Sequence, residues 1–194
     1  MKVLAEKVVE GKKLTEAFEG ILSKKEKIRS NSFKFLMRIS EEQPEILYPK
    51  YDYLANLLDS NNHYQRCISI NILANLAVID VKNKFEKIFD KYFGNIDSDR
   101  TMAAGQAVLN SGKIAKAKPN LQTKITKRLL DIEKNHRGKQ IDLIKAYTIE
   151  AFNNYFGESS DKNEILDFIK AQLNSRSPKT RKLAKEFLKK NEKS

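Results

Sequence analysis

Apolar residues recur at offsets of three and four along almost the whole chain, and short polar segments separate the runs. This spacing is the period of an α-helix with one buried face. The predicted helices cover residues 2–10, 14–22, 25–42, 82–93, 98–110, 140–156, 161–174 and 182–190, with others starting near Pro49, around Ile68 and at Pro119. No strand-like alternation of useful length occurs, so the pattern predicts an all-α protein.

Turn and capping residues mark where these helices begin and end. The segment Asp59-Ser-Asn-Asn62 predicts a loop with a helix cap, and Ser177 followed by Pro178 predicts the start of the last helix. Thr15 is a candidate cap of the second predicted helix. We expect Gly11, Gly94 and Gly112 to end helices, because glycine is the favoured residue just after a helix C-terminus.

One spacing recurs along the chain. A basic residue is followed at +3 by a small residue and at +7 by an apolar one. The basic residues are Arg29, Arg66, Arg100, Lys145 and Arg181, at intervals of 37, 34, 45 and 36 residues. The +3 residues are Ser32, Ser69, Ala103, Thr148 and Ala184, and the +7 residues are Leu36, Leu73, Ala107, Phe152 and Leu188. Repetition at this period predicts an α-solenoid of stacked helical hairpins.

We expect residues 1–194 to form one domain of about five units. The predicted units are 14–42, 45–79, 81–112, 119–156 and 161–190, and the short helix 2–10 caps the first. A small +3 residue lets neighbouring second helices approach. The basic residue is expected to reach a carboxylate or carbonyl of a neighbouring unit, with Asp59 and Asp97 as candidate partners; contact with a ligand is the alternative.

The last unit carries a family resemblance. The stretch Ser177-Pro-Lys-Thr-Arg-Lys-Leu-Ala-Lys-Glu-Phe-Leu188 resembles the second helix of a HEAT repeat, D-P-x-V-R-x-x-A-x-x-A-L. Arg181, Ala184 and Leu188 match the pattern, whereas Ser177, Thr180 and Phe187 replace its Asp, Val and Ala. Weaker copies begin at Asp99-Arg100 with Ala103, and at Arg66 with Ser69, Ile72 and Leu73. The resemblance implies a right-handed solenoid but no activity, since adaptors, transport receptors, regulatory subunits and a few enzymes share the repeat.

Candidate catalytic residues are sparse. His63 and His136 lie 73 residues apart in polar loops, and Cys67 is the one cysteine. Neither a HExxH nor a CxxC motif is present, the paired His-Glu dipeptides of HEAT-type iron hydroxylases are missing, and the glycines form no phosphate-binding loop. HEAT-like DNA glycosylases rely on tryptophan, and this chain has none. We therefore expect no enzyme, cofactor, metal or small-molecule substrate, and expect Tyr147 and Tyr155 to pack between helices.

Positive charge is concentrated in the second half. The net charge is +12, of which residues 1–112 carry +2 and residues 113–194 carry +10. Such asymmetry favours a polyanionic partner for residues 113–194; the alternative is that these cations only form a solvated surface. The candidate partner-binding residues are Lys124, Lys127, Arg128, Arg137, Lys139, Arg176, Lys179 and Lys182.

A continuous phosphate-binding groove would need further cations one and five positions after each repeat cation. Those positions hold Ser30, Cys67, Thr101, Ala146 and Lys182, then Lys34, Asn71, Gly105, Glu150 and Glu186. This mixed, small-residue ridge favours a protein partner over a nucleic acid.

The chain is therefore expected to be a cytoplasmic scaffold that binds a protein, with nucleic-acid binding through residues 113–194 as the alternative. The first ten residues carry charges within their apolar stretch, unlike a signal peptide. Asn71, Asn75 and Asp80 interrupt the longest apolar run, so we expect no membrane contact.

Overall fold

The computed structural model describes residues 2–97 and 101–191, with residues 2–10 described by their backbone alone. Within these ranges the regular structure is entirely helical and contains no strand, as predicted. Polar loops and short 3-10 turns connect the helices, and helical periodicity therefore identified the all-α class correctly.

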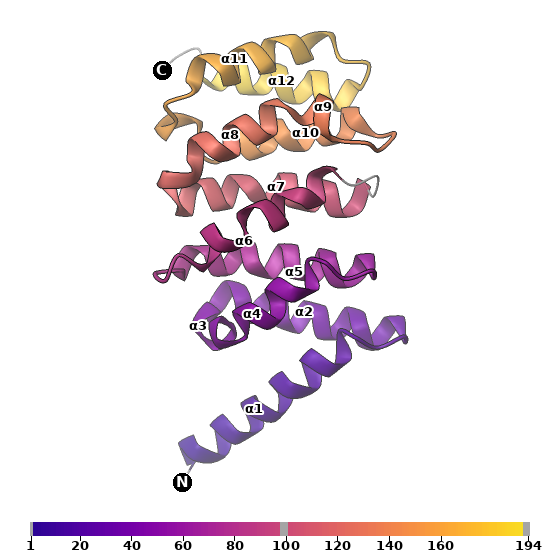
Figure 1. The fold of residues 1–194 in the computed structure, drawn as a ribbon, viewed down its shortest axis with the longest axis vertical. Helices are drawn as coiled ribbons and strands as arrows, with labels where there is room; N and C mark the ends of the chain where they lie inside the picture. Colours follow the sequence, from indigo (N-terminus) through magenta and orange to yellow (C-terminus); the bar gives the residue numbers. More distant parts are fainter. Residues whose placement is uncertain (1, 98–100, 192–194) are drawn as a thin grey trace.

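The helices follow one another along the long axis of the molecule (Figure 1). Their bounds are α1 (Lys2–Gly20), α2 (Glu26–Glu42), α3 (Pro44–Leu47), α4 (Tyr51–Leu57), α5 (His63–Leu76), α6 (Lys84–Phe93), α7 (Thr101–Ala117), α8 (Gln122–Leu130), α9 (Ile132–Asn135), α10 (Ile141–Phe152), α11 (Lys162–Ala171) and α12 (Pro178–Asn191). The N-terminal and C-terminal ends of the chain lie at opposite ends of this stack.

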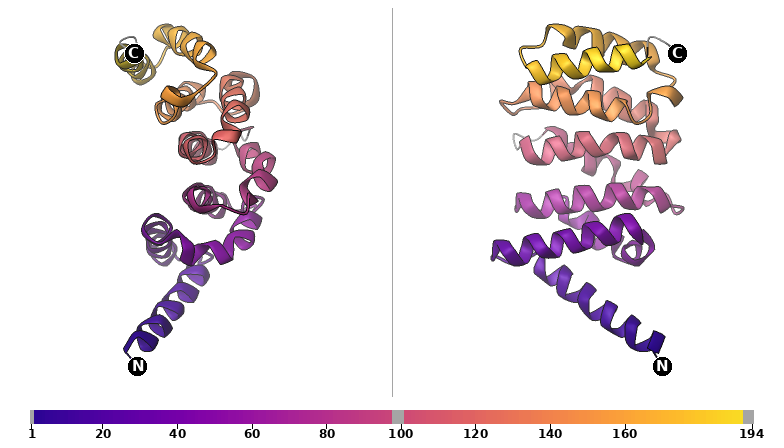
Figure 2. Two further views of the ribbon diagram at one scale, coloured as in Figure 1. Left: turned by 90° about the vertical axis from the view of Figure 1, so that its left-hand side faces the viewer. Right: turned by 180° about the vertical axis from the view of Figure 1, so that it is seen from behind.

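The side view shows two layers that bend together (Figure 2). Helices α2, α5, α7, α10 and α12 form the inner layer on the concave side, and α4, α6, α8 and α11 lie in the outer layer. Within the inner layer, α5 packs between α2 and α7, and α10 packs between α7 and α12. The three middle inner helices, α5, α7 and α10, thus each have an inner helix on both sides, and the remaining face of each is turned to the concavity.

Small residues on α7 allow it to pack closely against a neighbouring inner helix, α10. Helix α7 buries Ala103, Ala104, Ala107 and Gly112. A Cβ on Gly112 would overlap the carbonyl oxygen of Ala151 on α10 and lie 2.9 Å from its Cα. Gly112 therefore permits direct backbone contact between two inner helices.

Two of the five +3 residues of the repeat, Ser69 and Ser32, contact a first helix instead of the neighbouring second helix that was predicted. Ser69 donates a hydrogen bond to the carbonyl of Leu54 on α4 at 2.6 Å. Ser32 lies against Gly20 of α1, where a Cβ would be 2.9 Å from the Ser32 Cβ. In these two units the small residue faces the first helix of its own unit rather than the neighbouring inner helix.

Two predicted helix ends are wrong. The expected capping helix 2–10 and the helix 14–22 form one continuous helix, α1, which runs through Gly11. Gly112 likewise lies inside α7, which continues to Ala117. A glycine inside a helix costs only about 1 kcal/mol, so it does not end a helix by itself. Thr15 is not a cap either, because its hydroxyl donates to the carbonyl of Gly11 one turn earlier.

Other boundaries are confirmed. Helix α12 begins at Pro178, and the hydroxyl of Ser177 accepts a hydrogen bond from the amide of Thr180 at 3.3 Å. Asn62 caps α5 by accepting from the amide of Tyr64 at 3.0 Å. The expected caps of α7 at Asp97 and Ser98 fall at or beside positions 98–100, which lie outside the described residues.

Candidate binding surface on the inner helices

The repeat cations do not form one continuous series of contacts between units. Arg29 reaches the next unit, where its guanidinium carbon lies 4.2 Å from the ring centroid of Tyr64. Arg181 instead donates to the carbonyl of Ser175 in its own preceding loop at 2.7 Å. Lys145 forms an ion pair with Glu133 of its own unit, and the Nε of Arg66 is buried without a hydrogen-bond partner. Arg100 lies outside the described residues.

The candidate acidic partners of these cations bind residues of the outer layer. Asp59 pairs with Lys91, with 2.6 Å between carboxylate oxygen and Nζ, and Asp97 pairs with Arg128. Two similar pairs join Lys84 to Asp52 and Lys124 to Asp90. We call these four contacts the outer ion pairs. Each joins one outer helix, or the turn that follows it, to the next outer helix along the chain.

The outer ion pairs change the interpretation of the positive C-terminal half. Lys124 and Arg128 already face carboxylates of the preceding unit. Lys179 pairs with Glu150 at 3.2 Å, and Lys182 lies 3.8 Å from Glu186. Half of the candidate partner-binding cations therefore have a carboxylate neighbour.

The other four candidate cations make no ion pair among the described residues. They are Lys127 on α8, Arg137 and Lys139 before α10, and Arg176 before α12. They come from three separate segments of the chain.

A hollow opens on the concave face of the inner layer, and we call it the inner hollow. Its volume is about 220 Å³, and it is lined by Glu26, Arg29, Ser30, Phe33, Tyr64, Cys67, Ile68 and Met102. These residues come from three successive inner helices, α2, α5 and α7. Met102 is 56% exposed and Tyr64 is 41% exposed, so large apolar surfaces face solvent here. Sequence reasoning missed this site because it requires side chains from three units.

A second, more polar hollow shares a wall with the first. It measures about 540 Å³ and is lined by Leu22, Ser23, Lys24, Arg29, Asn61, Asn62, His63 and Tyr64. Because Arg29 and Tyr64 line both spaces, their stacked side chains separate an apolar compartment from a polar one. We call the two together the Arg29–Tyr64 groove.

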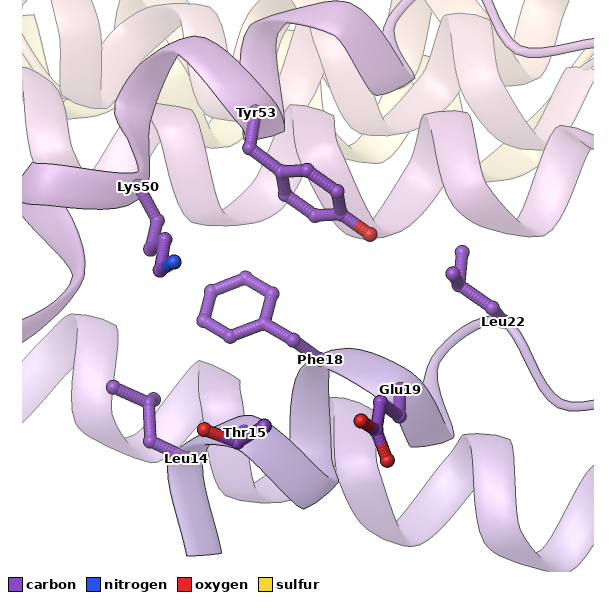
Figure 3. Close-up of a pocket in the computed structure, with 7 residues that line it drawn as sticks. All are labelled: Leu14, Thr15, Phe18, Glu19, Leu22, Lys50 and Tyr53. Carbon is purple, nitrogen blue, oxygen red and sulfur yellow. The ribbon is translucent and has the colours of Figure 1, made fainter. Parts of the chain in front are cut away.

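Another apolar hollow of about 260 Å³ lies where α1 diverges from α4 (Figure 3). Phe18 of α1 meets Tyr53 of α4 edge to face there, with ring centroids 5.5 Å apart. Leu14 lies on the α1 side, and the Lys50 side chain closes the space from the opposite side. This hollow lies along the seam between α1 and α4, and its Phe18–Tyr53 contact holds the two helices together.

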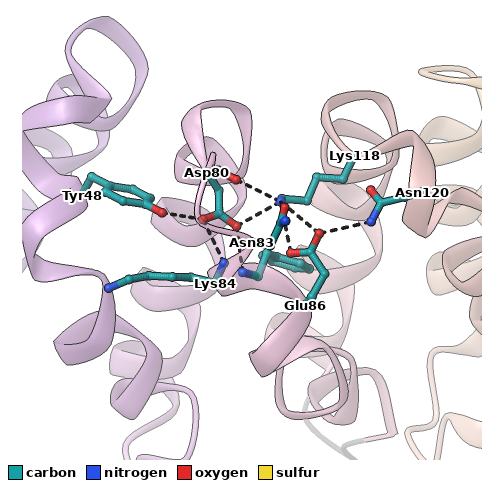
Figure 4. Close-up of polar contacts among 8 residues, drawn as sticks. Tyr48, Asp80, Asn83, Lys84, Glu86, Lys118 and Asn120 are labelled. Carbon is teal, nitrogen blue, oxygen red and sulfur yellow. Dashed lines mark hydrogen bonds and ion pairs between the residues drawn. The ribbon is translucent and has the colours of Figure 1, made fainter.

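A buried polar network joins the loops at one end of the helices (Figure 4). The ammonium of Lys118, whose side chain is 6% exposed, lies 3.0 Å from the fully buried carboxylate of Asp80. It also donates to both carboxylate oxygens of Glu86, at 3.2 and 3.1 Å. Asp80 in turn accepts hydrogen bonds from the hydroxyl of Tyr48 and from the amides of Lys84 and Phe85.

This buried network has a structural role, because it links segments that are far apart in the sequence. It connects the segment before α4, the turn between α5 and α6, and the residue after α7. Burial raises the pKa of Asp80, but the hydrogen bonds from Tyr48, Phe85, Lys84 and Lys118 outweigh this and leave the pKa below its usual value. Burial and the Asp80 contact raise the pKa of Tyr48 to about 12.

Several residues considered from the sequence have buried, structural positions. Gly105 and Ala146 of the predicted small-residue ridge are buried, so the ridge is not a continuous concave surface. Tyr155 is buried between helices as expected, with its hydroxyl 2.8 Å from that of Thr126. His136 is not a solvated loop residue, because it is buried and its Nδ1 lies 3.1 Å from the carbonyl of Ile96.

Cys67 lies at the inner hollow but is poorly suited to nucleophilic chemistry. Burial raises the pKa of its thiol to about 11, and the opposing effect of Arg66 is smaller. The reactive thiolate is therefore scarce at neutral pH. Within residues 11–97 and 101–191, no group of three or more His, Cys, Asp or Glu side chains is placed to hold a metal ion.

Comparisons with protein-family models, curated proteins and solved structures gave no match to this chain. None of the described helices is both long enough and apolar enough to cross a membrane. Function is therefore inferred from the geometry of the chain itself.

Proposed function

We propose that this chain is a non-catalytic binding scaffold, built as a right-handed α-solenoid of about five HEAT-like hairpins, that presents its concave face to a protein partner. The inner hollow is the observation that carries the proposal. It combines exposed Tyr64 and Met102 with the half-buried Phe33 at the meeting point of three inner helices. Exposed aromatic and Met side chains are typical anchors of protein interfaces.

The size of the hollow agrees with this proposal. At about 220 Å³ the inner hollow alone is smaller than the roughly 300–1,000 Å³ of pockets that enclose small-molecule ligands, and the hollow of about 540 Å³ beside it is lined mainly by polar residues rather than by the apolar ones typical of such pockets. An apolar side chain of a partner fits a space of this kind, while the rest of the partner lies across the inner helices. Binding of an extended or helical segment in a groove is a common mode of peptide recognition.

Nucleic-acid binding through residues 113–194 is the competing function. The charge of +10 in that half supports it. The ion pairs of Lys124, Arg128 and Lys179 with carboxylates weaken it, because part of that positive charge is neutralised within the protein. The four candidate cations that make no ion pair with a described residue also come from separate segments rather than from one helix face.

A comparative capture experiment tests the scaffold function. The purified chain is immobilised, incubated with extract of its source cells, and compared with the Met102→Glu variant. Val78→Glu is the matched control, since Val78 is a similarly exposed apolar residue, 62% accessible, in the 3-10 turn that follows α5. We expect the wild type and Val78→Glu to capture one protein in stoichiometric amount, and Met102→Glu not to capture it. The same difference in binding should be found with the purified partner. Retention of nucleic acid alone, or no partner sensitive to Met102→Glu, would contradict the proposal.

A further inference from the structure

The Arg29–Tyr64 groove has two compartments of different chemistry that share a wall. The inner hollow offers Phe33, Ile68 and Met102, and the adjoining hollow offers Lys24 and the polar side chains of Asn61 and His63. A ligand that fills both must carry an apolar group beside a polar one. This requirement narrows the class of partner.

Two cations, Lys24 and Arg29, line the polar compartment, and Glu26 lines the inner hollow beside it. Residues 24–29 contain Lys24, Lys25, Lys27 and Arg29 against the single carboxylate of Glu26. Lys24, Lys25 and Lys27 are exposed. Lys24 and Arg29 have no carboxylate partner among the described residues, unlike the cations of the outer ion pairs. Their charge is therefore available to a ligand.

The Arg29 guanidinium is held in place before any ligand arrives. One of its nitrogens donates to the carbonyl of Ser23 at 3.1 Å, and the guanidinium lies over the ring of Tyr64. A guanidinium has five N–H donors, so others remain for an acceptor. Because its position is fixed, less side-chain entropy is lost when a carboxylate binds.

We propose that the Arg29–Tyr64 groove binds a short acidic peptide segment of a partner protein, with one large apolar side chain in the inner hollow and adjacent carboxylates at Lys24 and Arg29. This deepens the proposed scaffold function and rests on it. A charge-assisted hydrogen bond to Arg29 would orient the segment, and the apolar side chain would supply most of the buried area. The positively charged rim would also favour encounter with acidic partners over basic ones.

A selection from random peptides tests the inference although the partner is unidentified. A phage-displayed library of random dodecapeptides is selected on the purified full chain, and the enriched sequences are read. The most enriched peptide is synthesised with a fluorescent label, and its affinity is measured by anisotropy. We expect enriched peptides to combine Asp or Glu with a nearby Leu, Met or aromatic residue.

Three variants and one control locate the binding. Arg29→Gln is expected to weaken binding by about tenfold, the effect of losing one charged hydrogen bond. Lys24→Glu is expected to weaken it by at least about tenfold, because it removes a cation and adds a carboxylate that repels the acidic segment. Met102→Glu should abolish it. Lys87→Glu places the same charge change on the exposed side of outer helix α6 and should leave the affinity unchanged. Circular dichroism and urea unfolding establish whether each variant is folded. If Arg29→Gln does not fold, Lys24→Glu still tests the charged side of the groove.

The outcomes separate this inference from the broader proposal. Enriched peptides that lack an acidic excess, or that bind Lys24→Glu as well as the wild type, would overturn the acidic-segment inference while leaving the scaffold intact. A second outcome would overturn the acidic-segment inference in favour of a nucleic-acid partner: no peptide is enriched, and labelled duplex DNA binds Lys24→Glu and Met102→Glu as tightly as it binds the wild type. The capture experiment is the separate test of the scaffold itself: if the wild type captures no protein, or Met102→Glu captures the same protein equally well, the scaffold proposal is wrong.

Discussion

The guanidinium of Arg29 covers the ring of Tyr64 at 4.2 Å, so a cation of α2 is stacked on an aromatic residue of the next inner helix. The basic residue of the repeat does contact the neighbouring unit here, through a π face rather than a carboxylate. The same pair forms the wall between the apolar and polar hollows. One contact thus joins two units and shapes the proposed site.

The Arg29–Tyr64 contact should give a measurable coupling energy. We expect the double-mutant cycle of Arg29→Ala and Tyr64→Ala to show about 0.5–1 kcal/mol of interaction in urea unfolding, the range for a partly exposed cation–π pair. Tyr64 is 41% exposed, which places the pair toward the weaker end. Strict additivity of the two single effects would show that the stacking contributes nothing to stability.

Replacement of Lys118 should be far more damaging than replacement of an exposed lysine. Lys118→Met leaves the buried carboxylate of Asp80 without its ammonium partner, and loss of one member of a buried pair costs about 3–5 kcal/mol. Lys87→Met on the exposed side of α6 is the control and should change the unfolding free energy by about 0.5 kcal/mol or less. Equal urea midpoints for the two variants would refute the structural role of the network.

Acid should weaken the same network in a defined direction. The folded-state pKa of Asp80 lies below its usual value, so its contribution to stability is present above about pH 4 and is lost as the pH falls through the folded pKa. We expect the urea midpoint of the wild type to fall more steeply than that of Asp80→Asn as the pH decreases below about 4. Parallel pH profiles would mean that Asp80 has the same pKa in the folded and unfolded states.

Gly112 should not tolerate even one methyl group. In an ordinary helix Gly→Ala is stabilising by about 1 kcal/mol, but here the new Cβ would meet the backbone of Ala151. We expect Gly112→Ala to destabilise the protein by about 1–3 kcal/mol, the usual cost of overpacking. Gly94→Ala is the control, because no atom lies within 4 Å of its Cβ position. A Gly112→Ala variant as stable as the control would show that α7 and α10 can move apart freely.

Local signals in the sequence predicted the helices and several of their ends. The period of apolar residues located the inner helices, and Ser177, Pro178 and Asn62 marked helix starts correctly. Gly11 was misleading because α1 continues through it, with open space at its Cβ position. Gly112 was misleading because a glycine just after a helix end and a glycine at a close helix contact look the same in one sequence. Only the packing of α7 on α10 distinguishes them.

The contacts between units were harder to predict for a physical reason. Each outer ion pair joins side chains 31 to 34 residues apart, and many acidic and basic residues of a chain with 32% charged content share such a separation. Asp59 and Asp97 were expected to bind the repeat cations of the inner helices, whereas outer-layer Lys91 and Arg128 bind them. The inner hollow likewise depends on Phe33, Tyr64 and Met102, whose proximity appears only after three units are stacked.

The two layers respond to different conditions. Apolar side chains and small residues hold the concave side, whereas the convex side is linked by the outer ion pairs, most of which include a largely exposed carboxylate. Dissolved salt screens charge contacts at the surface and leaves apolar packing almost unchanged. Ionic strength therefore acts more strongly on the convex side than on the concave side, where Lys179–Glu150 joins α12 to α10, and we expect the curvature of the molecule, and with it the width of its concavity, to change with salt concentration.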